Sequence, residues 1–286
     1  EILAILVFIA VTVFWVRRNI IKLARFWKSE MTSWPKSDAN YILYFEMVLM
    51  TLFLVMNAND VQFQSMDSGN IISQFIAPWF SGLPESSVHL VERAAWWLHI
   101  TGILIFLNYL YFSKHLHILL AFPNTFYASL KPKGQFNNLE AVTKEVKMMM
   151  DPSIDPFAAP VEGAEMPAKF GASDVQDLNW VQLLNAYTCT ECGRCTSECP
   201  ANLTGKKLSP RKIMMDTRDR LEEVGKNIDA NKGVFKDDGK QLLNDYITRE
   251  ELWACTSCNA CVEACPVSIN PLSIILEELT VRLPLL

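Results

Sequence analysis

Two stretches of the chain contain all eight of its cysteines. "TCTECGRCTSECP" (188–200) and "ACTSCNACVEACP" (254–266) share the spacing C-x2-C-x2-C-x3-C-P and lie 66 residues apart. This spacing is typical of chains that bind iron–sulfur clusters through cysteine thiolates. The short gaps wrap a loop around one cluster, and the last cysteine and its proline turn the chain away from that loop. The repeats therefore predict two [4Fe–4S] clusters.

The fourth cysteine of each run is expected to bind the other cluster, as in two-cluster ferredoxins. The predicted ligands of the first cluster are Cys189, Cys192, Cys195 and Cys265, and those of the second are Cys255, Cys258, Cys261 and Cys199. Disulfides and structural zinc are the alternatives. A cytoplasmic location disfavours disulfides, and zinc sites usually combine two separated C-x2-C pairs without a third and fourth cysteine at this spacing.

All four histidines lie on or beside the third apolar segment, which we expect to be one helix: His89, His99, His115 and His117. His99 and His117 are 18 residues apart, so on a continuous helix they share a face and stand roughly 27 Å from each other. Two b haems stacked across a membrane require such a pair of axial imidazoles. His115 points about 160° away from His99. Interfacial or structural histidines are the alternative reading.

Three apolar segments approach the length of a membrane span: Ile2–Val16, Tyr41–Ala58 and Ala94–Ser113. The first is short, and we expect that the sequence lacks part of its N-terminal segment. The connection between the first two segments is rich in Lys and Arg, whereas residues 59–92 contain neither. The positive-inside rule therefore places the first connection and both cysteine repeats on the cytoplasmic side.

Glu46 lies inside the second apolar segment, so it is a candidate quinone or proton site, although a glutamate that reaches toward the membrane surface is the favoured interpretation. The outer connection contains "NIISQFIAPWFSGLP", which we interpret as a short interfacial or re-entrant piece. Its length and its prolines argue against a further span.

The sequence predicts three domains: a transmembrane haem-binding domain over 1–122, a cytoplasmic linker or strap over 123–179, and a two-cluster domain over 180–286. Residues 151–173 are rich in Pro, Ala and Gly, which favours an extended linker. Helices are expected at Asn138–Met149, at Ser209–Val224 with Ser209 as N-cap, and at Pro271–Thr280 behind Asn270.

Composition agrees with a membrane protein that has a water-soluble part. Half of the 286 residues are hydrophobic, the mean hydropathy is positive, and the net charge is −5. A basic patch with interleaved aromatic residues is absent from the sequence, so we expect no nucleic-acid partner. The sequence also contains no G-x-G-x-x-G loop and no nucleophile motif, so substrate chemistry is expected on a partner protein.

The tandem cysteine motifs, with "LSPRKIMM" between them, resemble the iron–sulfur domain of the heterodisulfide reductase C protein and of anaerobic glycerol-3-phosphate and glycolate dehydrogenases. The segment "WLHITGILIFLNYLYFSKHLHILLAFPN" resembles the dihaem cytochrome b component of respiratory nitrate reductase. The whole resembles membrane-bound heterodisulfide-reductase-like (Fe–S)-binding proteins. This resemblance implies one or two haem b groups, with His99 and His117 as ligands and His115 as a substitute.

The expected fold is mainly α, a transmembrane helix bundle followed by an α-helical two-[4Fe–4S] ferredoxin domain. The expected function is electron transfer in the bacterial inner membrane, between the quinone pool and a cytoplasmic flavoprotein or heterodisulfide-reductase-like catalytic partner. Two alternatives stay open. In one the helices are a haem-free anchor for a ferredoxin domain, and in the other the clusters form a redox sensor.

Overall fold

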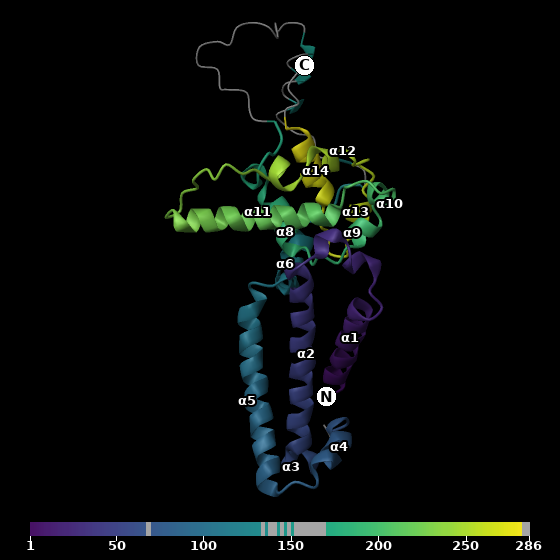
Figure 1. Cartoon of the computed structure of the whole chain (residues 1–286), viewed down its shortest axis with the longest axis vertical. Coiled ribbons are helices and arrows are strands. Elements are labelled where there is room, and N and C mark those ends of the chain that lie inside the picture. Colours follow the sequence, from purple (N-terminus) through teal and green to yellow (C-terminus); the bar gives the residue numbers. More distant parts are fainter. Residues whose placement is uncertain are drawn as a thin grey trace. The chain divides into compact units, whose positions relative to one another are not determined.

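The computed structural model describes residues 1–66, 70–132, 135–136, 142–143, 146–147, 150–151 and 170–281. The chain divides into two compact units, Glu1–Leu116 and His117–Leu286, whose α-helices are labelled in Figure 1. Across the described ranges the regular structure is helical, without a β-strand and with one isolated bridge between Leu243 and Ile247. The mainly α expectation is confirmed, and the predicted three-domain division stays a prediction.

The first unit is built on three helices that are long and apolar enough to cross a membrane: α1 (Ile2–Asn19), α2 (Trp34–Asn59) and α5 (Glu85–Leu110). Helix α2 lies between the other two and packs against both (Figure 1). Few of their side chains are buried within the unit, and in α5 these are only Ala95 and Leu110. Apolar helix surfaces that stay uncovered are suited to lipid or to further apolar helices.

Shorter helices connect the long ones: η1 (Ala24–Phe26), η2 (Ser29–Met31), α3 (Val61–Gln64), α4 (Ser73–Ile76), η3 (Ala77–Phe80) and η4 (Lys114–Leu116). The predicted interfacial piece of the outer connection forms α4 and η3. Phe75 and Trp79 on these two helices are strongly exposed. Helices α2 and α5 also begin seven and nine residues before their predicted apolar segments, because a hydropathy window marks the apolar part of a helix and omits its polar first turns.

Helix α5 ends at Leu110 because Asp38 of α2 binds the residues that follow. The Lys114 backbone N–H donates to Asp38 Oδ2 at 3.1 Å, where a continuing helix would direct it at the Leu110 carbonyl. The Ser113 hydroxyl donates to Asp38 Oδ1 at 2.8 Å, and the Tyr109 hydroxyl donates to the same oxygen. The expected continuous helix through His99 and His117 is therefore wrong, and His117 begins a separate helix.

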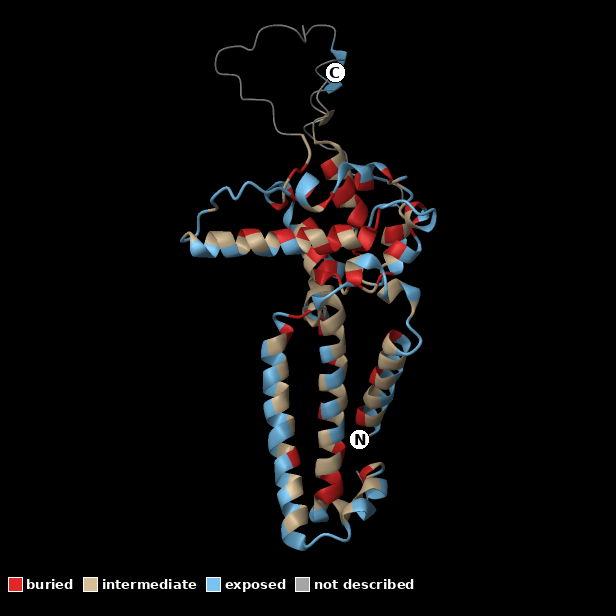
Figure 2. Ribbon diagram, viewed as in Figure 1, coloured by how far each residue is buried: buried red, intermediate tan, exposed pale blue. Residues whose placement is uncertain are grey.

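The second unit contains ten helical segments within its described residues. They are α6 (His117–Phe126), η5 (Val175–Asp177), α8 (Trp180–Thr188), α9 (Arg194–Ser197), α10 (Pro200–Leu203), α11 (Pro210–Ala230), η6 (Leu242–Tyr246), α12 (Arg249–Trp253), α13 (Ala260–Glu263) and α14 (Pro271–Leu279). Buried residues, red in Figure 2, gather where α8, α11 and α14 meet. The side chains of Ala186, Ile213 and Ile274 are fully enclosed there. This core supports the cysteine loops.

Two predicted helix starts are confirmed. The Ser209 hydroxyl accepts the Lys212 N–H at 3.3 Å and caps α11, and the Asn270 side chain accepts the Ser273 N–H at 3.0 Å and caps α14. Helix α11 continues to Ala230, six residues beyond its predicted end. The predicted helix at Asn138–Met149 lies largely outside the described residues.

A buried arginine joins three distant segments of the second unit. The Arg220 guanidinium on α11 is fully enclosed and binds Asp174 Oδ2 at 2.8 Å and Asp238 Oδ2 at 2.6 Å. Asp174 precedes η5 and Asp238 lies in the connection to η6. Removal of either partner would leave a buried charge incompletely compensated, so this network fixes how these segments pack.

Candidate iron–sulfur site

The two cysteine loops have the same backbone conformation. Glu191 and Gly193 adopt positive φ in the first loop, and Ser257 and Asn259 do so at the equivalent positions, 66 residues later. Each loop then enters a four-residue helix, α9 or α13. Positive φ is rare for residues other than glycine, so its repetition at matching positions shows that both loops are shaped to the same template.

This loop shape directs backbone N–H groups at cysteine sulfurs. The Ser257 N–H donates to Cys255 Sγ at 3.4 Å, and the Ile269 N–H donates to Cys265 Sγ at 3.4 Å. Hydrogen bonds to ligand sulfurs stabilise negative charge on them and tune the reduction potential of an iron–sulfur cluster. The loops thus supply the surroundings that a cluster bound by thiolates requires.

The structure brings the two repeats together, because α9 packs against α13. Burial raises the pKa of the Cys261 thiol to about 12, a shift that includes smaller contributions from negative charge on Cys255, Cys199 and Cys258. Cys199, the last cysteine of the first repeat, therefore interacts with Cys255 and Cys261 of the second.

Cys265, the last cysteine of the second repeat, in turn interacts with cysteines of the first repeat. Burial raises the pKa of the Cys195 thiol to about 12, with further contributions from Cys192, Cys261 and Cys265. Burial likewise raises the pKa of Cys265, which interacts with Cys192. Thiols that resist ionisation in isolation become thiolate ligands when a positively charged iron centre replaces their protons.

The donor set fits iron–sulfur clusters better than a mononuclear ion. Within the described ranges, no three Cys, His, Asp or Glu side chains converge as the ligands of one metal ion do. A [4Fe–4S] cluster takes one thiolate at each iron, so its ligands stand further apart than those of zinc. All eight cysteines are free thiols.

Charged side chains that the cysteine motif does not include lie beside the first loop. The Glu191 side chain is buried and binds Arg218 Nη2 of α11 at 2.8 Å. Burial raises the pKa of the Cys189 thiol, and the positive charge on Arg218 opposes this rise. Arg211, one heptad earlier on α11, donates to the Glu191 carbonyl at 3.4 Å. The seven-residue spacing of these two arginines puts both on one face of the helix, and this spacing in the sequence could have indicated that they act together.

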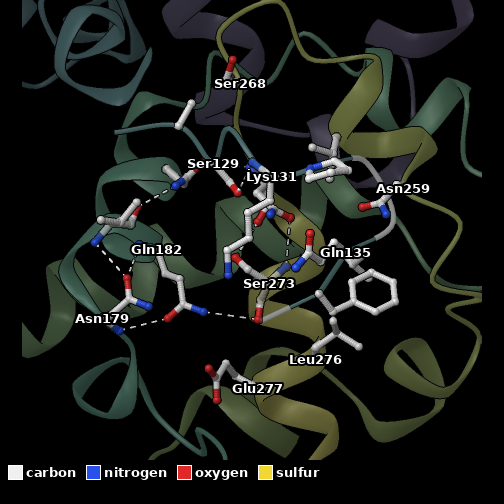
Figure 3. Close-up of a pocket in the computed structure, with 18 of the residues that line it drawn as sticks. Ser129, Lys131, Gln135, Asn179, Gln182, Asn259, Ser268, Ser273, Leu276 and Glu277 are labelled. Atoms are coloured by element: carbon white, nitrogen blue, oxygen red, sulfur yellow. Dashed lines mark hydrogen bonds between the residues drawn. The ribbon is translucent and has the colours of Figure 1, made fainter. Parts of the chain in front are cut away.

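A cavity of about 1690 Å³ opens beside the second loop. Its lining includes Cys258, Cys265 and Asn259, together with residues of α8 and α14. Figure 3 shows its polar wall, where Gln182 Nε2 of α8 donates to the Ser273 carbonyl of α14 at 3.2 Å. Cys258 is the one exposed cysteine among the eight. The second loop is thus the more accessible of the two.

His99, a predicted haem ligand, lies on α5 and faces α2. Its Nδ1 is 3.0 Å from the Leu49 carbonyl oxygen, and its ring lies 5.8 Å from that of Phe53. Gly102 follows one turn later, and a Cβ there would stand only 2.7 Å from Leu49 Cδ2. The glycine therefore permits the close approach of α5 to α2 that this hydrogen bond requires.

The other histidines occupy different settings. His115 Nε2 lies 3.6 Å from Glu46 Oε1, and its ring lies 5.6 Å from that of Phe106. His117 is the first residue of α6, in the second unit. His99 and His117, which were expected to share one face of a single helix, thus lie on separate helices.

Comparison with known proteins supports the iron–sulfur interpretation. Residues 188–269 match the family model of the 4Fe-4S dicluster domain. A probable iron–sulfur-binding oxidoreductase, FadF, of Bacillus subtilis is 29% identical over an alignment that covers 93% of this chain and 38% of the relative. An EtfAB:quinone oxidoreductase of Syntrophomonas wolfei is 26% identical over 219 residues, which cover 70% of this chain and 28% of that protein. No solved structure matches the chain significantly.

A third relative is the C protein of a ferredoxin/F(420)H(2)-dependent CoB-CoM heterodisulfide reductase from Methanosarcina acetivorans. It is 36% identical over 94 residues, which cover 33% of this chain and 44% of the relative, so the expected likeness to that protein is confirmed. The chain spans less than half the length of each of these relatives. It is similar to iron–sulfur oxidoreductases over most of its length, and it carries a two-cluster [4Fe–4S] ferredoxin domain together with three helices of membrane-spanning character.

Proposed function

We propose that this chain is an electron-transfer subunit of the bacterial inner membrane. It would pass electrons between a cytoplasmic redox partner and the quinone pool through two [4Fe–4S] clusters and b haems. The observation that carries the proposal is that one chain joins three membrane-length helices to two matched cysteine loops. When bound, such clusters take up and release single electrons.

The proposed cluster ligands are those expected from the spacing. Cys189, Cys192 and Cys195 with Cys265 would hold one cluster, and Cys255, Cys258 and Cys261 with Cys199 would hold the other. Negative charge on Cys199 raises the pKa of Cys261, and negative charge on Cys265 raises the pKa of Cys195, which supports this exchange of fourth ligands. In the second loop the N–H groups near the sulfurs stabilise the thiolates.

Electrons would pass to or from the partner at the second loop. Cys258 is exposed and lines the cavity beside α8 and α14, so a partner's redox group can approach it there. The partner would be a flavoprotein or a heterodisulfide-reductase-like catalytic protein. The name of one relative, EtfAB:quinone oxidoreductase, couples a redox partner with quinone and supports this class of function.

His99 would be a haem ligand. A ring that donates its Nδ1 proton to the Leu49 carbonyl keeps Nε2 unprotonated and able to bind an iron, and backbone carbonyls often fix ligand histidines in this way. His117 and His115 are the candidates for another haem. In the arrangement in which His117 binds that haem, the Glu46 carboxylate and the His115 imidazole would together hold a proton for a quinone that is being reduced.

The first experiment is a dithionite-reduced minus air-oxidised optical spectrum of the purified full-length protein in detergent, with haem and iron measured on the same sample. We expect about eight non-haem irons per chain, two four-iron clusters, and a sharp b-type α-band that fades when a menaquinone analogue is added. Iron at this level without a haem band would indicate that the helices only anchor the iron–sulfur domain to the membrane. A labile cluster without any quinone reaction would instead indicate a redox sensor.

A further inference from the structure

Helix α6 carries an uncovered apolar face. Ile118, Leu119, Phe122 and Phe126 fall within an arc of about 100° on this ten-residue helix. Phe122 is 79% exposed and Phe126 is 80% exposed, although phenylalanine normally lies in the core. The sequence from 117 to 126 contains no Asp, Glu, Lys or Arg. Exposure of this apolar face to water would be unfavourable, so we expect another apolar surface to cover it.

The opposite face of α6 is fixed to the second unit. Asn124, which lies on the far side of the helix from the apolar arc, is buried and donates its side-chain N–H to the Val267 carbonyl at 2.8 Å. Helix α6 packs against α8, and the Tyr127 and Trp180 rings meet edge to face with centroids 4.6 Å apart. The apolar arc therefore faces outward, away from this unit.

The chain itself indicates what covers the arc. Only six residues separate the end of α5, a helix of membrane-spanning character, from His117. A segment that follows a span so closely stays near the bilayer surface, since six residues reach at most about 20 Å. Tyr111 and Phe112, directly after α5, are strongly exposed, as aromatic residues at a membrane–water interface are.

We propose that α6 is a membrane-surface helix, with Ile118, Leu119, Phe122 and Phe126 inserted among lipid acyl chains at the interface. Short amphipathic helices bind bilayers in this orientation through Phe and Leu side chains. Val267, bound by the other face of α6, is two residues from Cys265. The helix would thus hold the second cysteine loop within about one helix diameter, roughly 10 Å, of the bilayer surface.

Photo-crosslinking tests this inference. The full-length protein, with p-benzoylphenylalanine in place of Phe122 or Phe126, is placed in nanodiscs of phosphatidylethanolamine and phosphatidylglycerol and irradiated. We expect phospholipid adducts, seen by mass spectrometry, at both positions. Val234→p-benzoylphenylalanine is the matched control, because Val234 is similarly exposed on the same unit but lies in the connection after α11. It should give no adduct above background.

A second control separates this inference from the membrane assignment itself. Leu104 is exposed on α5, and the same probe there should react with lipid if α5 crosses the bilayer. Lipid adducts at 104 without any at 122 and 126 would overturn the surface-helix proposal while leaving the span intact. A protein adduct at 122 would also overturn it, because the arc would then be an interface with another chain. Iron content equal to that of the unsubstituted protein verifies folding.

Discussion

Cys199 is the residue on which the assignment of cluster ligands depends. It lies in the first repeat, but its negative charge raises the pKa of Cys255 and Cys261 in the second repeat. A pair of double variants tests this placement. Cys199→Ala with Cys255→Ala removes two ligands of one cluster, so about four irons should remain, whereas Cys199→Ala with Cys189→Ala removes one ligand from each cluster and should leave almost none.

Both double variants remove two buried or half-buried thiols, so each serves as the control for the other. Iron is quantified per chain after purification under anaerobic conditions. Retention of about four irons in the Cys199/Cys189 variant and their loss in the Cys199/Cys255 variant would assign Cys199 to its own repeat.

His99 is expected to hold haem iron. His99→Ala should abolish at least one haem's contribution to the b-type α-band while non-haem iron stays unchanged, because the cysteine loops lie in the other unit. His89→Ala is the matched control, since His89 is exposed on the same helix. An unaltered band in the His99 variant would show that this residue does not bind haem iron.

At the scale of single elements, Asp38 determines where α5 stops. Asp38→Ala would leave the Tyr109 and Ser113 hydroxyls and the Lys114 N–H without this buried acceptor. Each unsatisfied buried donor costs about 1–3 kcal/mol, so we expect the unfolding temperature in detergent to fall by several degrees. Asp60→Ala should cost less, because Asp60 accepts only the Phe63 N–H in the short helix α3. Equal effects would show that Asp38 has no special role.

Helix α14 carries a buried carboxyl group. Burial raises the pKa of Glu278 to about 8, and the charges on Asp216 and Glu251 add to the shift while Lys212 opposes it. Neither Glu278 oxygen has a hydrogen-bond partner among the described residues. The folded state therefore keeps this proton while the unfolded chain releases it near pH 4.5, so stability is lost as the pH rises from about 4.5 to about 8.

Glu278→Gln removes this pH dependence. We expect the variant to be more stable than the parent protein at pH 8, by about 2 kcal/mol or more, since each pKa unit corresponds to about 1.4 kcal/mol. The difference should vanish near pH 4.5, where both proteins carry a neutral side chain in the folded state. Unfolding is followed by circular dichroism at the two pH values. The exposed Glu222→Gln serves as the control, and an equal gain there would contradict this explanation.

Some elements could be predicted from local sequence and others could not. The starts of α11 and α14 follow from Ser209–Pro210 and Asn270–Pro271, in which a cap residue directly precedes a first-turn proline. The cysteine spacing likewise predicted the cluster domain. The end of α5 could not be predicted, because the carboxylate that terminates it comes from Asp38, more than 70 residues earlier. The burial of Glu278 depends on elements that meet only in the folded chain.

At the scale of the whole molecule, the two units are compact separately. A variant without either cluster, Cys189→Ala with Cys255→Ala, should therefore still fractionate with membranes after a carbonate wash. The b-type band should persist, whereas its reduction by electrons supplied at the iron–sulfur unit should be lost. The parent protein treated identically is the control. Release of the variant into the soluble fraction would show that the membrane unit depends on the clusters for its stability.

The matched backbones of the two cysteine loops bear on the direction of electron flow. Because the loops have matching backbones, we expect a difference in reduction potential between the two proposed clusters to arise from side chains that differ at equivalent positions and from exposure to solvent. Glu191, paired with Arg218, stands where the second loop has Ser257, and Arg194 stands where it has Ala260. Solvent differs too, since Cys258 is exposed while Cys192 is half-buried. We therefore expect the two proposed clusters to differ in reduction potential, and exchanging these side chains between the loops should change the size of that difference.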